Sequence, residues 1–372
     1  MPNVAWFVPQ YLNISETFIY EPLQKMQRFT PLILTGKKKN LEQFPYNKVY
    51  SSSEDLPKSK VRKNDLLAMV GKEQYFAEII QKQKIQLLHA HFGVTGNFAV
   101  QFKERFGLPL VVSFYGADLY QYGRNLINKL MYKQLFKKAD LFLTCSDLMR
   151  QDLIRAGCPA DKVRRHYLGI DLNKISSPKR DKPKARLQLL LCGRFVEKKG
   201  FEYALRALEG IPKDKYFLNI IGDGSLKIKY LQIIGKLGLA ENISFLGNAN
   251  YAQFIKDLKQ SDILIVPSVK AKSGDSEGCM NMVILEGMAA GTVILSSDHS
   301  AFPEVVKDGQ TGYLSKEKDA GSIHDRLIHA IEHQQEFSRI RENARNLVEN
   351  DFNIEKQVGK LEDIYQELIA KK

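Results

Sequence analysis

Residues 188–221 read QLLLCGRFVEKKGFEYALRALEGIPKDKYFLNII. Two short apolar runs, 188–192 and 217–221, stand on either side of a longer segment with helical spacing. Parallel strands of one sheet need a crossover of a dozen or more residues between them, usually a helix. This strand–helix–strand order therefore predicts two neighbouring strands of a parallel sheet.

The same alternation runs through the whole chain. Short β-branched or aromatic runs separated by longer helical patterns occur at 4–8, 31–35, 87–91, 110–114 and 141–146, and again at 188–192, 217–221, 243–246, 263–267 and 292–296. Such alternation is typical of parallel sheets with helices on both faces. We therefore expect an α/β protein built from doubly wound, Rossmann-like sheets.

The length of 372 residues indicates two domains, since domains commonly have about 150 residues. Residues 173–184 are polar, contain proline and lack periodicity, so we interpret them as a linker between domains 1–172 and 185–354. The end of the chain reads as helix interrupted near 350–353, and we expect 355–372 to complete the first domain. Because ligands of doubly wound sheets bind at the carboxyl ends of the strands, the cleft between the domains is the expected active site.

Composition excludes several classes of protein. With 44% hydrophobic and 26% charged residues, the chain resembles an ordinary globular protein. No apolar run approaches the roughly 20 residues of a membrane span, and the start lacks a basic leader, so we expect neither insertion nor export. The cysteines lack the spacing of zinc ligands, which predicts a reducing cytoplasm and no structural metal; they are Cys145, Cys158, Cys192 and Cys279.

The formal net charge of +13 is distributed unevenly. Residues 1–180 carry 28 Lys and Arg against 15 Asp and Glu, whereas residues 181–372 carry 27 of each kind. The asymmetry indicates a negatively charged partner for the first half: nucleic acid, anionic lipid or a phosphate-bearing substrate. A solvated basic surface is the plain alternative.

The strongest local signal is the stretch 274–291, which reads GDSEGCMNMVILEGMAAG. A Gly-rich acidic loop leads into a helix, and backbone N–H groups at a helix start form an anion site suited to a diphosphate. Glu277 and Glu286 can accept hydrogen bonds from sugar or ribose hydroxyls. The structural alternative makes Glu277 a residue favoured by the helix dipole and Glu286 a solvated one.

A second signal lies at 191–200, which read LCGRFVEKKG. Arg194 can hold a phosphate through its guanidinium fork, and Lys199 adds a positive charge beside it. Together they would stabilise a leaving nucleoside diphosphate without Mg²⁺. Taken alone, two surface cations in a loop are the simpler interpretation.

These two stretches belong to an ordered series. The further members in the second half are IIGDG at 220–224, FLG at 245–247, SDILIVPS at 261–268 and FPEVVKDGQTGYL at 302–314. The series resembles the retaining GT-B glycosyltransferases of family 4, whose second domain binds a nucleotide sugar. In the first half, SETFI at 15–19, HAHFG at 89–93, SFYGAD at 113–118 and LGID at 168–171 are similar to the branch that builds exopolysaccharides and lipopolysaccharides, including colanic-acid-type enzymes. The resemblance covers nearly the whole chain.

The resemblance implies a role for each matching residue. Glu277 falls on the donor sugar, Glu286 on the ribose, and Arg194 with Lys199 on the diphosphate, so we take Arg194, Lys199 and Glu277 as catalytic. The other expected donor-binding residues are Gly193, Gly222, Gly278, Cys279, Met280 and Asn281. Glu277 and Glu286 are nine positions apart, where the family has eight. Either the loop bulges by one residue before the helix, or Glu277 lies outside the sugar site.

The first half offers acceptor-side candidates. Tyr115 stands where many family members carry His, and tyrosine is a poor base near neutral pH. This fits the family's proposed mechanism, in which the departing phosphate takes the acceptor's proton. Asp118 is a candidate to hold a hydroxyl, or equally to cap a turn. We expect His89 and His91, at a strand end, to point to opposite faces, with His91 toward the cleft or in a structural role.

A further acceptor-side group follows the first strand. Ser15, Glu16 and Thr17 form a turn that would bring hydroxyls and backbone N–H groups toward the diphosphate. Equally, Ser15 is a suitable cap for the helix that follows.

The resemblance and the residues together predict a cytoplasmic, metal-independent, retaining hexosyltransferase without cofactor. It would move a sugar from a nucleoside diphosphate to a glycan or lipid-linked acceptor in cell-surface polysaccharide biosynthesis. The basic first half, with runs at 37–39, 58–63 and 133–138, predicts peripheral docking on the anionic inner face of the membrane. The alternatives are a nucleotide-sugar epimerase of the same fold and, in another class, a nucleic-acid-binding protein that uses the basic first half. We do not expect nucleic acid as a partner.

Overall fold

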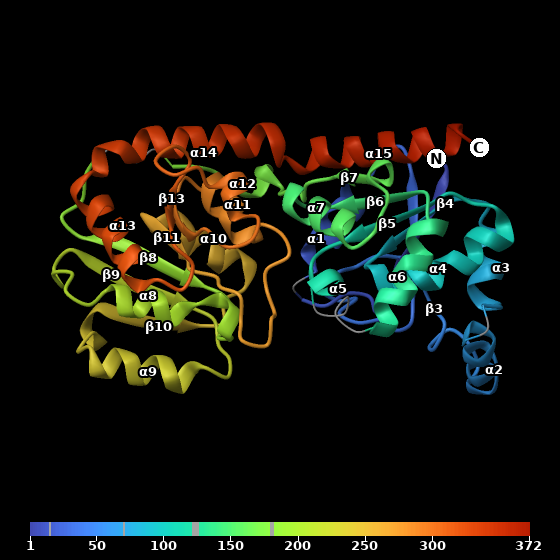
Figure 1. The fold of residues 1–372 in the computed structure, drawn as a ribbon, viewed down its shortest axis with the longest axis horizontal. Coiled ribbons are helices and arrows are strands. Elements are labelled where there is room, and N and C mark those ends of the chain that lie inside the picture. Colours follow the sequence, from blue (N-terminus) through green and yellow to red (C-terminus); the bar gives the residue numbers. More distant parts are fainter. Residues whose placement is uncertain (15, 70, 121–125, 179–181) are drawn as a thin grey trace. The chain divides into compact units, whose positions relative to one another are not determined.

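The computed structural model describes residues 1–372 except 15, 70, 121–125 and 179–181. The chain divides into two compact units, which we describe separately (Figure 1). Unit 1 comprises Met1–Gly169 together with Ile354–Lys372, and unit 2 comprises Ile170–Asn353. The end of the chain therefore returns to the unit that contains its beginning.

Unit 1 is built on a parallel sheet in the order β3-β2-β1-β4-β5-β6-β7. Its strands are β1 (Asn3–Val8), β2 (Thr30–Thr35), β3 (Val49–Ser51), β4 (Ile85–His91), β5 (Leu110–Phe114), β6 (Leu141–Thr144) and β7 (Val163–Arg165). Its helices are α1 (Thr17–Lys25), α2 (Lys58–Met69), α3 (Tyr75–Lys82), α4 (Gly93–Phe106), α5 (Ala117–Tyr120), α6 (Leu126–Lys138), α7 (Asp147–Arg155) and α15 (Ile354–Ala370), with a 3₁₀ turn η2 (Ala160–Lys162). Helix α15 packs against α1 and β4.

Unit 2 has the sheet order β10-β9-β8-β11-β12-β13, again parallel. Its strands are β8 (Leu187–Cys192), β9 (Tyr216–Ile221), β10 (Ile243–Gly247), β11 (Ile263–Val266), β12 (Val293–Ser297) and β13 (Tyr313–Ser315). Its helices are α8 (Phe201–Ala207), α9 (Lys227–Lys236), α10 (Tyr251–Gln260), α11 (Met282–Ala289), α12 (Phe302–Val305), α13 (Ala320–Glu332) and α14 (Phe337–Asp351). The 3₁₀ turns are η3 (Leu172–Lys174), η4 (Glu197–Lys199), η5 (Ala240–Asn242) and η6 (Gln334–Glu336).

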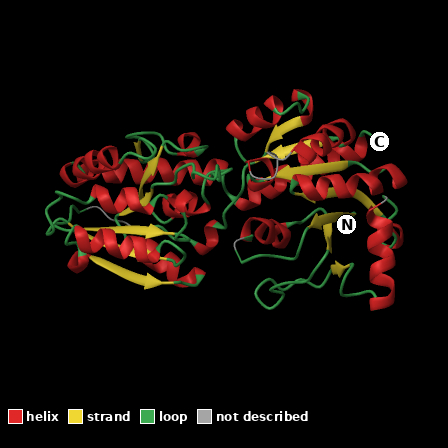
Figure 2. Ribbon diagram, turned by 60° about the horizontal axis from the view of Figure 1, so that its bottom comes forward, coloured by secondary structure: helices red, strands yellow, loops and turns green. Residues whose placement is uncertain are grey.

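The expected α/β class with doubly wound parallel sheets is confirmed. In unit 2, α8 packs with α9 and α13, while α11 packs with α10 and α14, which gives one helix layer on each side of the sheet (Figure 2). Strand β11 is buried along its whole length, as a strand covered on both faces must be. Each of the ten expected strand runs overlaps an observed strand. The short edge strands β3, β7 and β13 were not predicted from the sequence.

The order of the strands places the site. The sheet of unit 2 grows in opposite directions from β8 and β11, and ligands of such sheets bind at the carboxyl ends of the strands beside this reversal. The segment after β8 is fixed by Phe195, which is fully buried and packs against Phe201 and Tyr230 at 5.7 and 5.3 Å between ring centroids.

Within the described part of the chain, no helix is long and apolar enough to cross a membrane.

Candidate active site

Two glycines bring the ends of β8 and β9 into close contact. The Gly193 N–H donates to the Ile221 carbonyl at 3.0 Å. A Cβ on Gly222 would lie 2.0 Å from the Gly193 carbonyl oxygen, and Gly222 has a φ of +132°. Only glycine fits both the space and the backbone conformation, so this edge keeps bare backbone where a ligand can approach closely.

Lys199 and Glu277 meet beside this glycine pair. The Lys199 Nζ lies 2.9 Å from Glu277 Oε1, in an ion pair that lacks hydrogen-bond geometry, and donates to Asn281 Oδ1 at 3.0 Å. The side chains of Lys199 and Glu277 are only 15% and 12% exposed. Gly200 makes this approach possible, because a Cβ there would stand 1.9 Å from the Pro267 carbonyl oxygen.

The charge on Glu277 follows from its surroundings. Burial raises the pKa of this carboxyl, but the positive charges of Lys199 and Lys198 outweigh burial and hold the pKa below its ordinary value. Lys198 itself pairs with Asp275 at 3.2 Å. The site therefore presents an ionised, nearly buried carboxylate that can accept hydrogen bonds from hydroxyl groups.

The loop from β11 to α11 carries the remaining donor-side candidates. Asn281 precedes α11 and makes no side-chain cap bond to it; its side chain accepts from Lys199 and contacts Ser268 Oγ at 3.4 Å. Gly278, Cys279 and Met280 are buried in this loop. Because residues 277–281 precede the helix, the nine-residue spacing to Glu286 does not prevent Glu277 from reaching Lys199.

Glu286 and Arg194 lie in different environments. Glu286 is half-buried on α11, near Cys192 at the end of β8: burial and the negative charge of Glu286 raise the pKa of the Cys192 thiol to about 12. Arg194 is exposed, and within the described residues its side chain makes no ion pair. Its guanidinium is therefore open to an anion from solvent.

In unit 1, the expectation that His89 and His91 point to opposite faces is wrong. Side chains two positions apart on a strand share a face, and the two rings stack with centroids 4.3 Å apart. His89 bonds Ser113 Oγ at 2.7 Å, while His91 Nδ1 shares a 2.7 Å hydrogen bond with the Tyr115 hydroxyl. His91 lines a cavity of about 30 Å³, and its Nε2 has no hydrogen-bond partner among the described residues.

The pKa shifts in this cluster argue against proton transfer by its members near neutral pH. Burial lowers the pKa of His91 to about 3, so the imidazole stays neutral. Burial raises the pKa of the Tyr115 phenol, which stays protonated. Tyr115 can donate a hydrogen bond, but it cannot serve as a base at neutral pH.

Asp118 shapes the turn around it. Its carboxylate accepts the N–H groups of Gly93, Tyr115 and Gly116 at 3.1, 3.2 and 2.9 Å. Burial nevertheless raises its pKa. These bonds favour the turn-capping interpretation of Asp118.

Glu16 lies in the turn after β1. Ser15 lies outside the described residues. Glu16 accepts from the Asn13 N–H and side-chain amide, both at 2.8 Å, and Thr17 is the first residue of α1. The carboxylate of Glu16 is thus occupied by its own turn.

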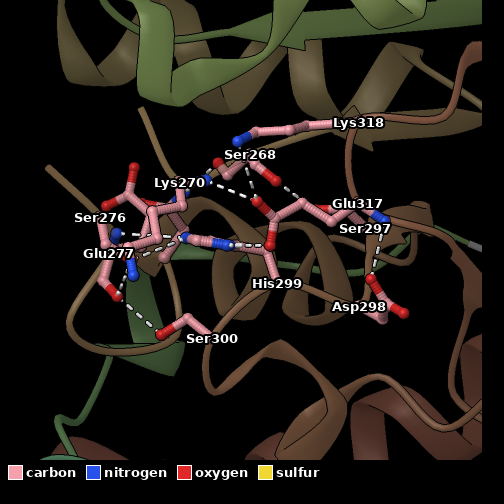
Figure 3. A network of polar contacts seen from close by, with 11 residues as sticks. Ser268, Lys270, Ser276, Glu277, Ser297, Asp298, His299, Ser300, Glu317 and Lys318 are labelled. Carbon is pink, nitrogen blue, oxygen red and sulfur yellow. Dashed lines mark hydrogen bonds and ion pairs between the residues drawn. The ribbon is translucent and has the colours of Figure 1, made fainter. Parts of the chain in front are cut away.

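Sequence reasoning missed one group of residues beside Glu277. His299 follows β12 and contacts Ser276, Glu277 and Glu317, which Figure 3 shows as a connected polar network. Polar residues just after the expected strand 292–296 were the available signal. Among the described residues, no three His, Cys, Asp or Glu side chains are placed to hold a metal ion.

Comparison with known sequences identifies the family. The model described as Glycosyl transferases group 1 matches residues 173–347, and that described as Glycosyltransferase Family 4 matches residues 33–174. The amylovoran biosynthesis glycosyltransferase AmsK of Erwinia amylovora is 30% identical over 75% of this chain and 69% of its own length. The putative colanic acid biosynthesis glycosyltransferase WcaL of Escherichia coli K12 is 29% identical over 71% of this chain and 66% of its own length.

Comparison with solved structures agrees on the fold. Anabaena Alr3699/HepE, crystallised in complex with UDP, has a TM-score of 0.81 at 19% identity, covering 99% of this chain and 100% of that one. The lipopolysaccharide outer core galactosyltransferase WaaB has a TM-score of 0.73 at 16% identity, covering 96% of this chain and 98% of that one. With two Rossmann-like parallel sheets and both family models matched, the chain belongs to the family 4 glycosyltransferases of the GT-B fold.

Proposed function

We propose that this protein is a retaining glycosyltransferase that moves a sugar from a nucleoside diphosphate to a glycan or lipid-linked acceptor in cell-surface polysaccharide biosynthesis. The observation that carries the proposal is the Lys199–Glu277 pair beside the bare glycine edge of β8 and β9. In this pair, an ammonium that can bind phosphate lies 2.9 Å from a carboxylate that can accept hydrogen bonds from sugar hydroxyls. The relatives named for amylovoran and colanic acid biosynthesis support the biological role.

The donor contacts follow from charge and position. Lys199 and exposed Arg194 would hold the diphosphate, and Glu286 on α11 would accept from the ribose hydroxyls. The ionised Glu277 would accept from hydroxyls of the sugar. The UDP and UDP-glucose bound in crystals of Anabaena HepE support a nucleotide-sugar donor.

The proposed chemistry uses no protein nucleophile and no metal. As the bond between the sugar and the diphosphate breaks, negative charge grows on the leaving phosphate, and fixed cations stabilise it. Lys199 is preorganised for this role because Asn281 and Glu277 hold its ammonium. The leaving phosphate then takes the proton of the acceptor hydroxyl as the new bond forms on the same face of the sugar.

His91, Tyr115 and Asp118 remain the proposed acceptor-side residues, with Glu16 and Thr17. Since His91 is neutral and Tyr115 protonated, the phenol can donate a hydrogen bond to an acceptor or sugar oxygen. Asp118 would act through the turn that it caps, rather than as a base.

We further propose that unit 1 docks on anionic membrane. Met69, Val94 and Met131 are 80%, 46% and 41% exposed and line one open groove of about 900 Å³, whose charged residues are Lys72, Arg105 and Glu104. Apolar side chains amid cations suit an interface with anionic headgroups, where each Lys or Arg contributes about 1 kcal/mol. Tyr132 and Phe136 of α6 are buried in the core and do not line this groove.

Vesicle sedimentation tests the docking. We expect salt-sensitive binding to phosphatidylglycerol vesicles and none to phosphatidylcholine, with Met69→Ser/Met131→Ser weakening it. Equal binding to both vesicles, or none to anionic vesicles at low salt, contradicts the proposal.

Calorimetry and turnover test the proposed function itself. UDP should bind the wild-type protein in EDTA, and a panel of nucleotide sugars should include one that is cleaved slowly in water and faster with its acceptor. Arg194→Ala should lower the rate about 10²- to 10³-fold, the cost of removing one preorganised charge-stabilising group. A protein that binds neither nucleoside diphosphates nor nucleotide sugars would refute the function, and tight oligonucleotide binding would favour the nucleic-acid alternative.

A further inference from the structure

The segment that carries Glu277 is held from outside its own loop. His299 and Ser300 follow β12, and Glu317 follows the neighbouring strand β13, so the carboxyl ends of two adjacent strands bring them together. His299 is 3% exposed. Its Nδ1 lies 2.9 Å from Glu317 Oε2, and its Nε2 lies 3.0 Å from Ser276 Oγ (Figure 3).

His299 and Ser300 form hydrogen bonds with the backbone N–H and the backbone carbonyl of Glu277. The Glu277 N–H donates to His299 Nε2 at 3.4 Å, and Ser300 Oγ–H donates to the Glu277 carbonyl at 2.6 Å. Ser300 has a φ of +54°, in the left-handed region that non-glycine residues rarely adopt. Such backbone strain persists where surrounding structure holds it, commonly at functional sites.

The hydrogen bonds favour one tautomer of the neutral imidazole. With Nε2 accepting the Glu277 N–H, the ring hydrogen is on Nδ1 and is donated to the Glu317 carboxylate. Glu317 is itself oriented, since its other oxygen accepts the Lys270 N–H at 2.7 Å. A carboxylate that orients one imidazole nitrogen thereby presents the other nitrogen in acceptor form.

We propose that His299, oriented by Glu317, is a positioning residue that fixes the Glu277 carboxylate for contact with the donor sugar. The inference rests on the proposed function, in which Glu277 contacts that sugar. His299 acts only through the Ser276–Glu277 segment, since its polar contacts reach neither Lys199 nor Arg194. Its loss should therefore spare nucleotide binding and impair the sugar-dependent step.

A double-mutant cycle separates positioning from general support. With UDP and the nucleotide sugar that the wild type cleaves, His299→Ala should lower kcat about 10-fold, the order expected for one lost hydrogen bond, and leave the Kd for UDP within about twofold. In a Glu277→Ala background, adding His299→Ala should change kcat by less than about twofold, since residues acting as a unit are not additive. His299→Gln, whose side-chain oxygen can accept the Glu277 N–H, should recover part of the rate.

The matched control is His324→Ala, a half-buried histidine of the same unit that bonds the Ala207 carbonyl at 2.9 Å. It should leave kcat unchanged. Additive losses in the cycle, or equal losses of kcat and UDP affinity in His299→Ala, overturn the proposal.

Hydrogen exchange keeps the inference separate from the proposed function. Peptides covering 273–281 should exchange faster in His299→Ala and His299→Gln/Ser300→Ala than in the wild type or His324→Ala. Unchanged exchange overturns the positioning of Glu277 by His299. A wild-type protein that binds neither nucleoside diphosphates nor nucleotide sugars refutes the proposed function instead, and the exchange result still decides whether His299 holds the segment.

Discussion

Replacing Lys199 with methionine tests the central ion pair of the site. The substitution keeps an unbranched apolar stem of similar volume and removes the ammonium that lies 2.9 Å from Glu277 Oε1. The Glu277 carboxylate, 12% exposed, then stays in place without its principal counter-charge. Lys198 is the matched control, because it is 14% exposed and pairs with Asp275 at 3.2 Å.

The expected cost follows from burial and depends on pH. Removing one partner of a buried pair costs 3–5 kcal/mol, so we expect about 2–3 kcal/mol for this slightly exposed pair. In the wild type, the lowered pKa of Glu277 stabilises the fold at pH values above the ordinary pKa of a glutamate. This stability is lost as the pH falls through the lowered pKa. In Lys199→Met, burial loses the largest of the charges that oppose it and raises that pKa, so the deficit grows as pH rises through the raised value.

Thermal denaturation measures the deficit. For a unit of this size, about 2–3 kcal/mol corresponds to a Tm decrease of about 4–12 °C at about pH 7.5, and to a smaller decrease at about pH 4.5. Adding Glu277→Gln to Lys199→Met should restore most of the Tm at the higher pH, because it removes the unpaired charge. Lys198→Met should shift the Tm less. Equal decreases at both pH values, with no recovery in the double variant, would refute the reasoning.

Further predictions concern nucleotide binding, the glycine edge and the sugar. Glu286→Ala should weaken UDP binding about 10- to 100-fold by calorimetry, as expected for lost hydrogen bonds to a charged group, and an unchanged Kd would remove Glu286 from the ribose site. Gly222→Ala should lower the Tm sharply, because its Cβ would stand 2.0 Å from the Gly193 oxygen, whereas Gly235→Ala, with nothing within 4 Å, should not. A nucleotide uronate should bind at least about 10-fold more weakly than the matching neutral hexose, since the ionised Glu277 repels a carboxylate; equal affinity would contradict this.

Much of the fold could be predicted because its signal is local. Runs such as 110–114 and 263–267 are buried on both faces, and apart from Ser113 their residues are apolar. Strands β3, β7 and β13 have three residues each, too few to show a pattern, and they lie at or near the sheet edges. Their pairing depends on neighbours rather than on their own sequence.

The candidate site was predictable only where the family's motif carries it. Lys199 and Glu277 are 78 positions apart in the sequence, and their contact depends on the register of β8 and β11 and on Gly200 beside Pro267. His299 and Glu317 carry only a weak local signal, because polar residues after a strand are also typical of ordinary loops. The error over His89 and His91 was different, since strand geometry alone places residues two apart on one face.

Sugar transfer with its stereochemistry tests the central claim most directly. The wild-type protein would be incubated in EDTA with a radiolabelled, α-linked nucleotide sugar and a lipid-linked acceptor fraction, and the labelled product digested with anomer-specific exoglycosidases. Our account predicts transfer undiminished by EDTA, release of the label by the α-specific enzyme, and a rate about 10²- to 10³-fold lower in Lys199→Met. Release by the β-specific enzyme, or transfer abolished by EDTA, would contradict it.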